Sequence, residues 1–281
     1  MFEVLDASDW EAVAVVETGR RPKEWVVEPA MRRRALFKSA VHHSGEVAVE
    51  RVASEVGKLL GIPTADTALA LRHGIQGILS FSVVSGTESL IDGGDLLIAR
   101  DASFDRTHAR VHAFQLVREV LPPELLGPFV DLLLLDAVIG NSDRHQDNWS
   151  IIQAPPALTK LAPSYDHGSS LGRDWAEANL VGMLPAALDQ YVKNGRSRVG
   201  WREGETVTRL RHIDLLVRVA EAHPDLVATS VGRLHGVEKD QADAIVDAIS
   251  DTFASLGRRN LMKELLWRRI AQIKARFNVD A

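Results

Sequence analysis

The sequence predicts an α+β fold with two lobes, a small β-rich N-terminal lobe followed by a larger, mainly helical C-terminal lobe. Two observations lead to this expectation. Short apolar or alternating runs, separated by Gly, Pro or charged turns, fill most of the first 85 residues, as in strands. From residue 107 onward the apolar residues recur mainly at helical spacing. We therefore expect the N-lobe to span residues 1–85 and the C-lobe residues 86–281, with the boundary within residues 80–90.

The N-lobe pattern predicts strands and one helix. The strand-like runs are EAVAVVET, RALFKSA, DTALALRH and IQGILSFSVV. Between the second and third run, GEVAVERVASEVGKLLGIP has apolar residues at helical spacing. Ser44 is a candidate N-cap for this helix, and Gly61 with Pro63 ends it.

The C-lobe pattern predicts six helices and little strand. Strand-like runs are confined to WSIIQ and ALTKLA, on either side of a turn at Pro155 and Pro156. The candidate helices cover approximately residues 107–120, 124–139, 183–192, 205–221, 237–255 and 256–277.

Composition excludes several classes of protein. The absence of cysteine rules out disulfides, thiolate nucleophiles and Cys-ligated metals, and suits the reducing cytoplasm. The N-terminus, MFEVLDASDW, lacks the apolar core of a signal peptide. The longest apolar run is interrupted by Asp131 and Asp136 and is too short to cross a membrane. We therefore expect a cytoplasmic protein with no membrane insertion.

The net charge of −5 argues against direct nucleic-acid binding, because phosphate neutralisation needs a basic surface. The C-terminal stretch LGRRNLMKELLWRRIAQIKARF is rich in Arg and Lys. Its apolar residues follow a helical period, which favours a docked amphipathic helix with a solvated basic face over a binding patch.

The stretch GNSDRHQDNW, residues 140–149, carries the main functional signal. It follows the apolar run FVDLLLLDAVIG, which we interpret as a buried helix that delivers a polar loop to a cleft. Asp143 and Asn148 lie five residues apart on that loop, and Asp166 follows the next short hairpin. This pattern is typical of kinase-type phosphotransferases. One Asp carboxylate accepts the acceptor's hydroxyl proton, while the Asn and the second Asp offer hard oxygen ligands for Mg²⁺.

Three other interpretations of this stretch exist, of which one is excluded and two are left as alternatives. An EF-hand counted from Asp143 would need Gly and Glu where the chain has Asn148 and Ala154, so it is excluded. A metal-hydrolase cluster of Asp143, His145 and Asp147 has suitable ligands but no second His-bearing motif of comparable quality. A cluster of capping and turn residues is the remaining structural alternative.

A kinase-type site also requires a strand lysine and a helix glutamate to hold it. Lys38 in RALFKSA is the candidate lysine, and a lysine in an apolar strand needs an anionic partner. Glu50 in the following helix is the candidate partner, because small neighbours let that face approach the sheet. Glu46 and Glu55 are its competitors, and Lys38 could instead end the strand in solvent.

The loop ETGRRPKEW, residues 17–25, is the candidate phosphate loop. Backbone amides of Thr18, Gly19 and Arg20 and the charge of Lys23 could hold phosphates. The loop has a single glycine and does not match a Walker A loop, so a hairpin turn with basic surface residues is the alternative.

Taken together, these segments resemble the HipA-like serine/threonine kinases, including the compact HipT-type toxin kinases. The resemblance rests on TGRRPKEW, ALFK, VERVASEVGKLLGIP, IGNSDRHQDNW and LAPSYDHGSSLG, in unbroken order. The DRHxxN element is shared with phosphatidylinositol-kinase-like enzymes. The longer members carry an N-terminal subdomain, and this chain resembles the short type.

The resemblance implies a bilobal protein-kinase-like fold that uses ATP and Mg²⁺. It makes Asp143 the catalytic base and His145 a residue that orders the catalytic loop, with Arg144 either doing the same or meeting phosphate. Asn148 and Asp166 would bind Mg²⁺, and Lys38, held by Glu50, would contact the nucleotide phosphates. The backbone near Phe81 and Ser82 would form the hinge that meets adenine.

The resemblance also implies a substrate class and a partner. HipA-like toxins phosphorylate aminoacyl-tRNA synthetases and are restrained by DNA-binding antitoxins, so a protein serine is the first expectation and an antitoxin the expected partner. A small-molecule kinase for an antibiotic or a sugar, a lipid kinase, and an ATP-binding pseudokinase are the alternatives. Family members autophosphorylate a serine in the phosphate loop, where this chain offers Thr18.

Overall fold

The N-terminal part of the protein is built on one twisted sheet. The computed structural model describes residues 1–16, 23–40, 44–106, 112–154, 158–180 and 182–280. The sheet formed by these residues has six strands in the order β1-β5-β6-β4-β3-β2, antiparallel except between β1 and β5. The strands are β1 (Val4–Asp6), β2 (Glu11–Val16), β3 (Lys23–Val27), β4 (Arg34–Ser39), β5 (Thr67–Arg72) and β6 (Ile75–Phe81).

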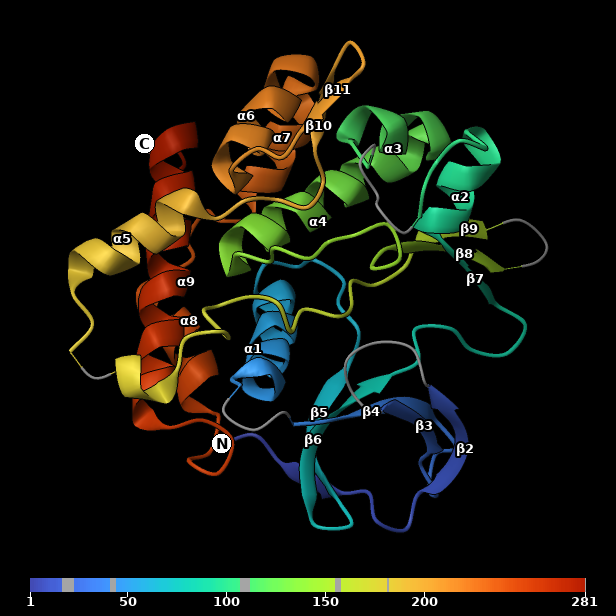
Figure 1. Ribbon diagram of the computed structural model, residues 1–281, viewed down its shortest axis with the longest axis vertical. Coiled ribbons are helices and arrows are strands. Elements are labelled where there is room, and N and C mark those ends of the chain that lie inside the picture. The colour runs from blue at the N-terminus through green and yellow to red at the C-terminus, as the bar shows by residue number, and fades with distance from the viewer. Residues whose placement is uncertain (17–22, 41–43, 107–111, 155–157, 181, 281) are drawn as a thin grey trace.

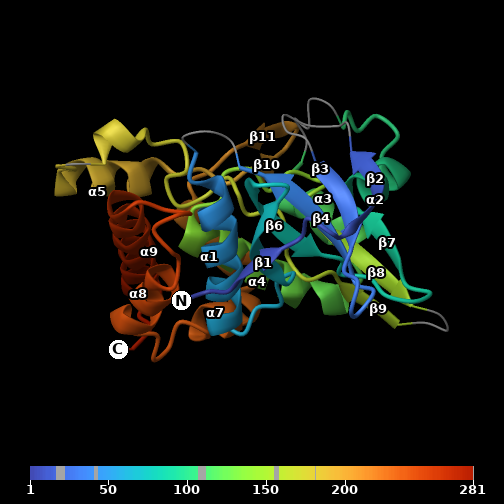
Figure 2. The same cartoon turned by 90° about the horizontal axis from the view of Figure 1, so that it is seen from below.

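Helix α1 (Glu46–Leu59) lies between this sheet and the C-terminal helices, as Figures 1 and 2 show. It contacts β5 and β6 on one side and α4 (Leu126–Ile139) and α8 (Lys239–Asp247) on the other. The expectation that Ser44 caps this helix is wrong, because Gly45 occupies the N-cap position. The helix therefore links the two lobes through its two buried faces.

The alternation of side chains along β4 aims Lys38 at α1. Phe37 packs with Trp10 in a small cluster on the outer face of the sheet. Lys38, one residue later, pairs across the ladder with Ile78, which belongs to the main core on the α1 side. Because successive strand residues point to opposite faces, Lys38 faces the helix.

Helix α4 forms the centre of the C-terminal part. It is buried on nearly all sides and contacts α6 (His212–Ala222), α7 (Pro224–Gly232) and α9 (Leu256–Phe277). In Figure 1 it runs between α1 and the α6–α7 pair. A helix that is apolar all round belongs in such a core, and its end delivers the following loop to the junction of the lobes.

Shorter elements surround this core. They are the three-stranded sheet β7 (Ser89–Asp92), β8 (Ser150–Ala154) and β9 (Leu158–Leu161), the helices α2 (Gly93–Arg100), α3 (Phe114–Val120) and α5 (Pro185–Asn194), the hairpin β10 (Trp201–Glu203) and β11 (Thr206–Thr208), and the 3₁₀ turns η1 (Pro123–Leu125) and η2 (Glu177–Asn179). Within the described residues no helix combines the length and the apolar character needed to span a membrane.

The predicted two-lobed α+β arrangement is confirmed. Some of the individual helices differ from the prediction. The helix expected over residues 205–221 begins only at His212, because a hairpin that turns at Gly204 with φ +59° precedes it. Helices α2 and α7 were not predicted. The bounds of α9 agree with the expected residues 256–277.

Candidate functional site

Three charged side chains meet where the N-terminal sheet faces the C-terminal lobe. Lys38 Nζ donates to Oε1 of Glu50 and to Oδ1 of Asp166, both at 2.8 Å. Lys38 and Glu50 are 4% and 2% exposed, whereas the side chain of Asp166 is 35% exposed. The buried lysine thus has the anionic partner expected from the sequence and a second one that opens to solvent.

The pKa values of Lys38 and Asp166 keep both of these groups charged. Burial acts to lower the pKa of Lys38, but the carboxylates of Glu50 and Asp166 outweigh it and raise that pKa above its usual value. Lys38 in turn holds the pKa of Asp166 well below its usual range, against the effect of burial. A cation with one buried and one solvent-facing carboxylate can exchange the second for another anion without leaving its site.

The loop after α4 brings Asp143 and Asn148 together. Helix α4 ends at Gly140, whose φ of +68° turns the chain out of the helix. Asn141 Oδ1 accepts a hydrogen bond from the Asp143 amide at 3.1 Å. Asn148 Nδ2 donates to the Asp143 carbonyl oxygen at 2.7 Å. This last bond uses the amide nitrogen of Asn148 as a donor, so Oδ1 is the side-chain atom that could serve as a metal ligand.

Arg144 ties the two loops of the site together from inside the protein. It is fully buried and bonds the Asp136 carboxylate through Nε at 3.0 Å and Nη2 at 2.9 Å. It also donates to the carbonyl oxygen of Tyr165 at 2.9 Å and to Ser164 Oγ at 3.1 Å, and lies 3.1 Å from His167 Nδ1. With no exposed surface, Arg144 positions the segment around Asp166.

His145 and Asp147 hold the outer side of the same loop. His145 Nδ1 accepts a hydrogen bond from the Asp147 amide at 3.1 Å. The Asp147 carboxylate accepts from Arg106 Nε at 2.8 Å, and Arg106 also bonds Asp95 of α2 at 2.6 Å. Asp147, whose role the sequence did not indicate, thus links the loop to α2.

A buried histidine supports the loop from behind. Trp149 Nε1 donates to His112 Nε2 at 3.2 Å, and the two rings stack with centroids 6.4 Å apart. Burial, with nearby His145 and Arg198, lowers the pKa of His112 to about 3. His112 is therefore neutral at physiological pH and acts as a hydrogen-bond acceptor.

A second cation lies beside Asp143. Arg209 donates to the carbonyl oxygen of Ser142 at 3.2 Å and to that of Ser197 at 3.1 Å. Burial and the nearby Arg198 lower the pKa of Arg209, whereas the Asp143 carboxylate raises it. Arg209 thus brings positive charge close to the Asp143 carboxylate.

The candidate phosphate loop is only partly described. Lys23 lies at the start of β3, directly opposite Lys38 of β4, and adds to the effect of Lys38 in lowering the pKa of Asp166. The remaining predicted residues lie outside the described residues: Thr18, Gly19 and Arg20.

The predicted hinge lies at the end of β6. The Phe81 amide donates to the Asp66 carbonyl oxygen at 2.9 Å, and the Ser82 amide to that of Arg34 at 2.8 Å. Both backbone donors are therefore already used. If this segment meets adenine, Val83 is the next candidate donor along the chain.

The donor set fits Mg²⁺ better than a hydrolytic metal. Asp166 and Asn148 offer hard oxygens on the two loops that Arg144 joins. Among the described residues, no group of three His, Asp or Glu side chains converges as a metal site. This finding disfavours the metal-hydrolase interpretation of Asp143, His145 and Asp147.

Sequence reasoning missed several residues that shape the site, among them Asp136, Arg106 and Arg209. Asp136 carried a usable signal, since a carboxylate within an otherwise apolar helix requires a buried partner. Arg106 and Arg209 carried none, because their contacts join segments far apart in the chain.

Comparisons with known proteins agree with this geometry. No family model and no curated protein sequence matches the chain. The structure is similar to the proinflammatory kinase CtkA of Helicobacter pylori, with a TM-score of 0.82 over 98% of both chains at 16% identity. It is also similar to HipA of Shewanella oneidensis MR-1, solved with HipB and operator DNA, with a TM-score of 0.57 over 95% of this chain and 67% of that chain at 13% identity. The predicted kinase-like fold is confirmed, and the resemblance to HipA-like kinases holds at the level of fold.

Proposed function

We propose that the protein is an ATP- and Mg²⁺-dependent kinase that transfers the γ-phosphoryl group to a serine hydroxyl of a protein. The observation that carries this proposal is the Lys38 cluster, in which one ammonium group bridges the helix residue Glu50 and the loop residue Asp166. Phosphoryl transfer depends mainly on positioning and charge stabilisation, and this cluster supplies both.

The nucleotide phosphates would meet Lys38 at its open side. Glu50 would keep the ammonium group in place, and Asp166 would share its carboxylate between Lys38 and the metal. Asp166 and Asn148 would hold Mg²⁺, which neutralises charge on the phosphates when bound. Asn148 is oriented for this task by its bond to the Asp143 carbonyl oxygen.

Asp143 would act on the acceptor. Its carboxylate accepts the hydroxyl proton as the acceptor oxygen bonds to the γ-phosphorus and the bond from that phosphorus to the leaving ADP oxygen breaks. Arg209, fixed to the Ser142 carbonyl oxygen, adds positive charge where the transferred group carries negative charge.

The acceptor and the partner rest on the likeness to HipA. Its structure contains HipB and operator DNA, so we propose an antitoxin-like protein partner for this chain. We also propose a protein acceptor such as an aminoacyl-tRNA synthetase, which the resemblance of the sequence motifs to HipA-like kinases implies. We also propose a cytoplasmic location, which a chain without cysteine suits.

Incubation with γ-labelled ATP and Mg²⁺, with and without cell extract, tests this function. We expect label in one protein band of the extract, no transfer by Asp143→Asn, and nearly unchanged nucleotide binding in that variant. Asp174→Asn is the matched control, because its side chain is 80% exposed on the segment after Asp166. Labelling of a small molecule alone would mean that the acceptor is not a protein. ATP binding without any turnover would contradict the proposed kinase activity.

A further inference from the structure

Arg269 of α9 is a buried cation for which the described residues offer no carboxylate partner; Tyr191 lies near enough to interact with its charge. The residue is 3% exposed, and its guanidinium forms no hydrogen bond or ion pair with the described part of the chain. Its Nε atom is buried with no acceptor. An uncompensated buried charge is costly, so an arginine in this state calls for an anion.

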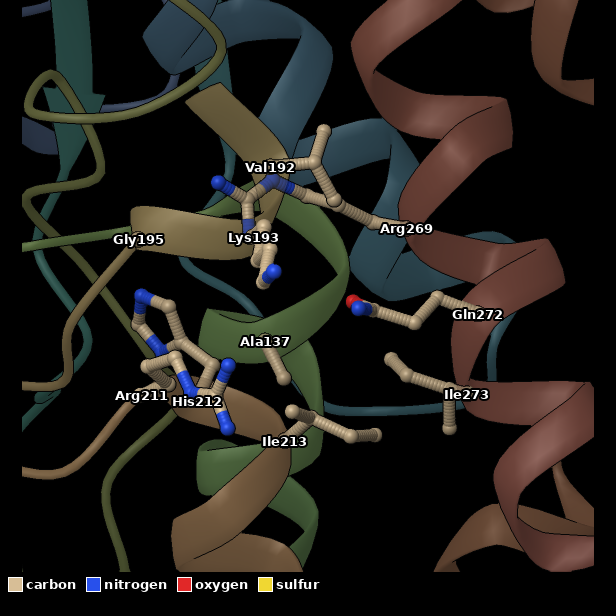
Figure 3. A pocket seen from close by; sticks show the side chains of 10 residues that line it. All are labelled: Ala137, Val192, Lys193, Gly195, Arg211, His212, Ile213, Arg269, Gln272 and Ile273. Atoms are coloured by element: carbon tan, nitrogen blue, oxygen red, sulfur yellow. The ribbon is translucent and has the colours of Figure 1, made fainter. Parts of the chain in front are cut away.

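The guanidinium lies at a small cavity where α9 meets the ends of α4 and α5 and the start of α6 (Figure 3). Lys193, Arg211 and His212 contribute nitrogen-bearing side chains to its lining, and the Gln272 side chain points into it. None of the described residues that line it carries a carboxylate. Arg211 is neutralised by Asp214, which leaves Arg269 and Lys193 as the uncompensated charges.

His212 adds a second polar atom without a partner. It is 5% exposed, and its Nε2 atom is buried with no hydrogen-bond partner. Burial, with Arg269 and Arg209 nearby, lowers the pKa of His212 well below its usual value, so the ring is neutral. With its proton on Nε2, a neutral ring donates one hydrogen bond to an anion in the cavity.

Two glycines make room for the guanidinium. A Cβ on Gly140 would lie 2.5 Å from Cζ of Arg269, and one on Gly195 would lie 2.7 Å from Nη2. The cavity itself leaves about 10 Å³ for the centre of a water-sized sphere. This space suits one water-sized particle, such as a monatomic ion or a single oxygen of a larger anion.

We propose that this cavity binds a small inorganic anion, either a chloride ion or one oxygen of a phosphate ion, between Arg269, Lys193 and His212. Burial, opposed only by nearby Tyr191, lowers the pKa of Arg269 to about 10, and a bound anion would offset that effect. Because Gly140 ends α4 only three residues before Asp143, the anion ties α9 to the start of the catalytic loop. The site goes beyond the proposed kinase function and does not depend on it.

Thermal unfolding at constant ionic strength tests the site. Sodium gluconate, a bulky and weakly binding reference salt, is replaced stepwise by sodium chloride or by sodium phosphate. We expect a saturable rise in Tm of about 3 °C or more in at least one series. A response to chloride alone identifies a halide site, and a response to phosphate alone identifies an oxyanion whose remaining atoms project through the opening.

Variants connect the response to the cavity. Arg269→Met should abolish it and leave the Tm in gluconate unchanged or higher, because an apolar side chain of similar length removes the buried charge. Lys193→Met lies at the exposed mouth, cannot disturb the core, and should weaken the response. Arg276→Met, an exposed arginine of the same helix, should retain it in full. Equal Tm values in all salts for the unmodified protein, or an unchanged response in Arg269→Met, would overturn the proposal.

Discussion

Arg144 and Lys38 are two buried cations of the same site with different surroundings. Arg144 is fully buried, and every group that it contacts belongs to the interior or to the backbone of the two loops. Lys38 is nearly as buried, but one of its two carboxylate partners, Asp166, is 35% exposed. The surroundings of Arg144 are closed to solvent, whereas those of Lys38 are open on the side of Asp166. We call Arg144 the closed cation and Lys38 the open cation.

This difference suits the two residues to different tasks: Arg144 to holding the two loops in place, and Lys38 to the proposed binding of an anionic ligand. The partners of Arg144 cannot be exchanged without opening the core, so it fixes the geometry. The ammonium group of Lys38 can divide its hydrogen bonds between Asp166 and an incoming anion such as a phosphate. The solvent-facing Asp166 carboxylate can then be hydrated or bind a cation.

Removing the closed cation should produce the largest loss. Arg144→Met leaves the Asp136 carboxylate buried with Asn141 as its only remaining side-chain partner among the described residues. We expect the free energy of unfolding in urea to fall by about 3–5 kcal/mol. Arg218→Met, which breaks ion pairs of a 45% exposed side chain, should cost at most about 1 kcal/mol. Equal losses in the two variants would contradict the distinction.

Removing the open cation should affect activity more than stability. Lys38→Met is expected to reduce phosphoryl transfer by about 10²–10³-fold or more, since it deletes a preorganised positive charge. Its stability should fall less than that of Arg144→Met, because the partly exposed carboxylate of Asp166 can be hydrated. Lys58→Met on the exposed end of α1 should change neither property much. Normal transfer by Lys38→Met would exclude its phosphate role.

The buried His112, which supports the same loop, should influence how the stability of the protein responds to acid. His112 titrates near pH 6.5 in the unfolded chain but at about 3 in the folded one, so the unfolded state binds the proton first as the pH falls. Stability is therefore lost from about pH 6.5 downward, by up to about 1.4 kcal/mol per pH unit for this residue. His112→Gln, whose amide oxygen can accept from Trp149, should make the pH profile of Tm less steep, with the buried His167 and His212 accounting for part of the remaining slope. The exposed His73→Asn should leave the profile unchanged, and an unchanged profile in His112→Gln would refute the assignment.

The smallest effect is expected at the rim of the catalytic loop. Asp147→Asn weakens the bond to Arg106, whose side chain is 38% exposed, so the stability loss should stay below about 1 kcal/mol. Phosphoryl transfer should fall only a few-fold, as measured by initial rates. A loss comparable with that of Arg144→Met would mean that the rim, and not Arg144, holds the loop.

Residues whose neighbours lie on the same short element were predictable. The alternation in RALFKSA placed Lys38 opposite Phe37, and the helical period of the next segment offered Glu50, which the structure brings to 2.8 Å from Lys38. The apolar run before GNSDRHQDNW correctly indicated the buried helix α4. The roles of these residues in catalysis, and the boundary within residues 80–90, remain predictions.

Contacts between distant segments were not predictable from local pattern. The bond from Arg209 to Ser142 depends on the β10–β11 hairpin. The apolar spacing of residues 205–221 predicted a helix there and gave no sign of this hairpin. Arg106 reaches Asp147 across 41 positions of the chain. Arg144 lies in a run of polar residues typical of an exposed loop, and only the burial of Asp136 explains why it is enclosed.

Calorimetric titration with ATP, in the presence and absence of Mg²⁺, tests most directly whether the Lys38 cluster is the open, ligand-binding part of the site. The unmodified protein and Asp174→Asn should bind ATP more tightly with Mg²⁺ than without it. Asp166→Asn should lose that difference, because the solvent-facing carboxylate next to Lys38 is removed. An Mg²⁺ dependence in Asp166→Asn equal to that of the unmodified protein would contradict the account.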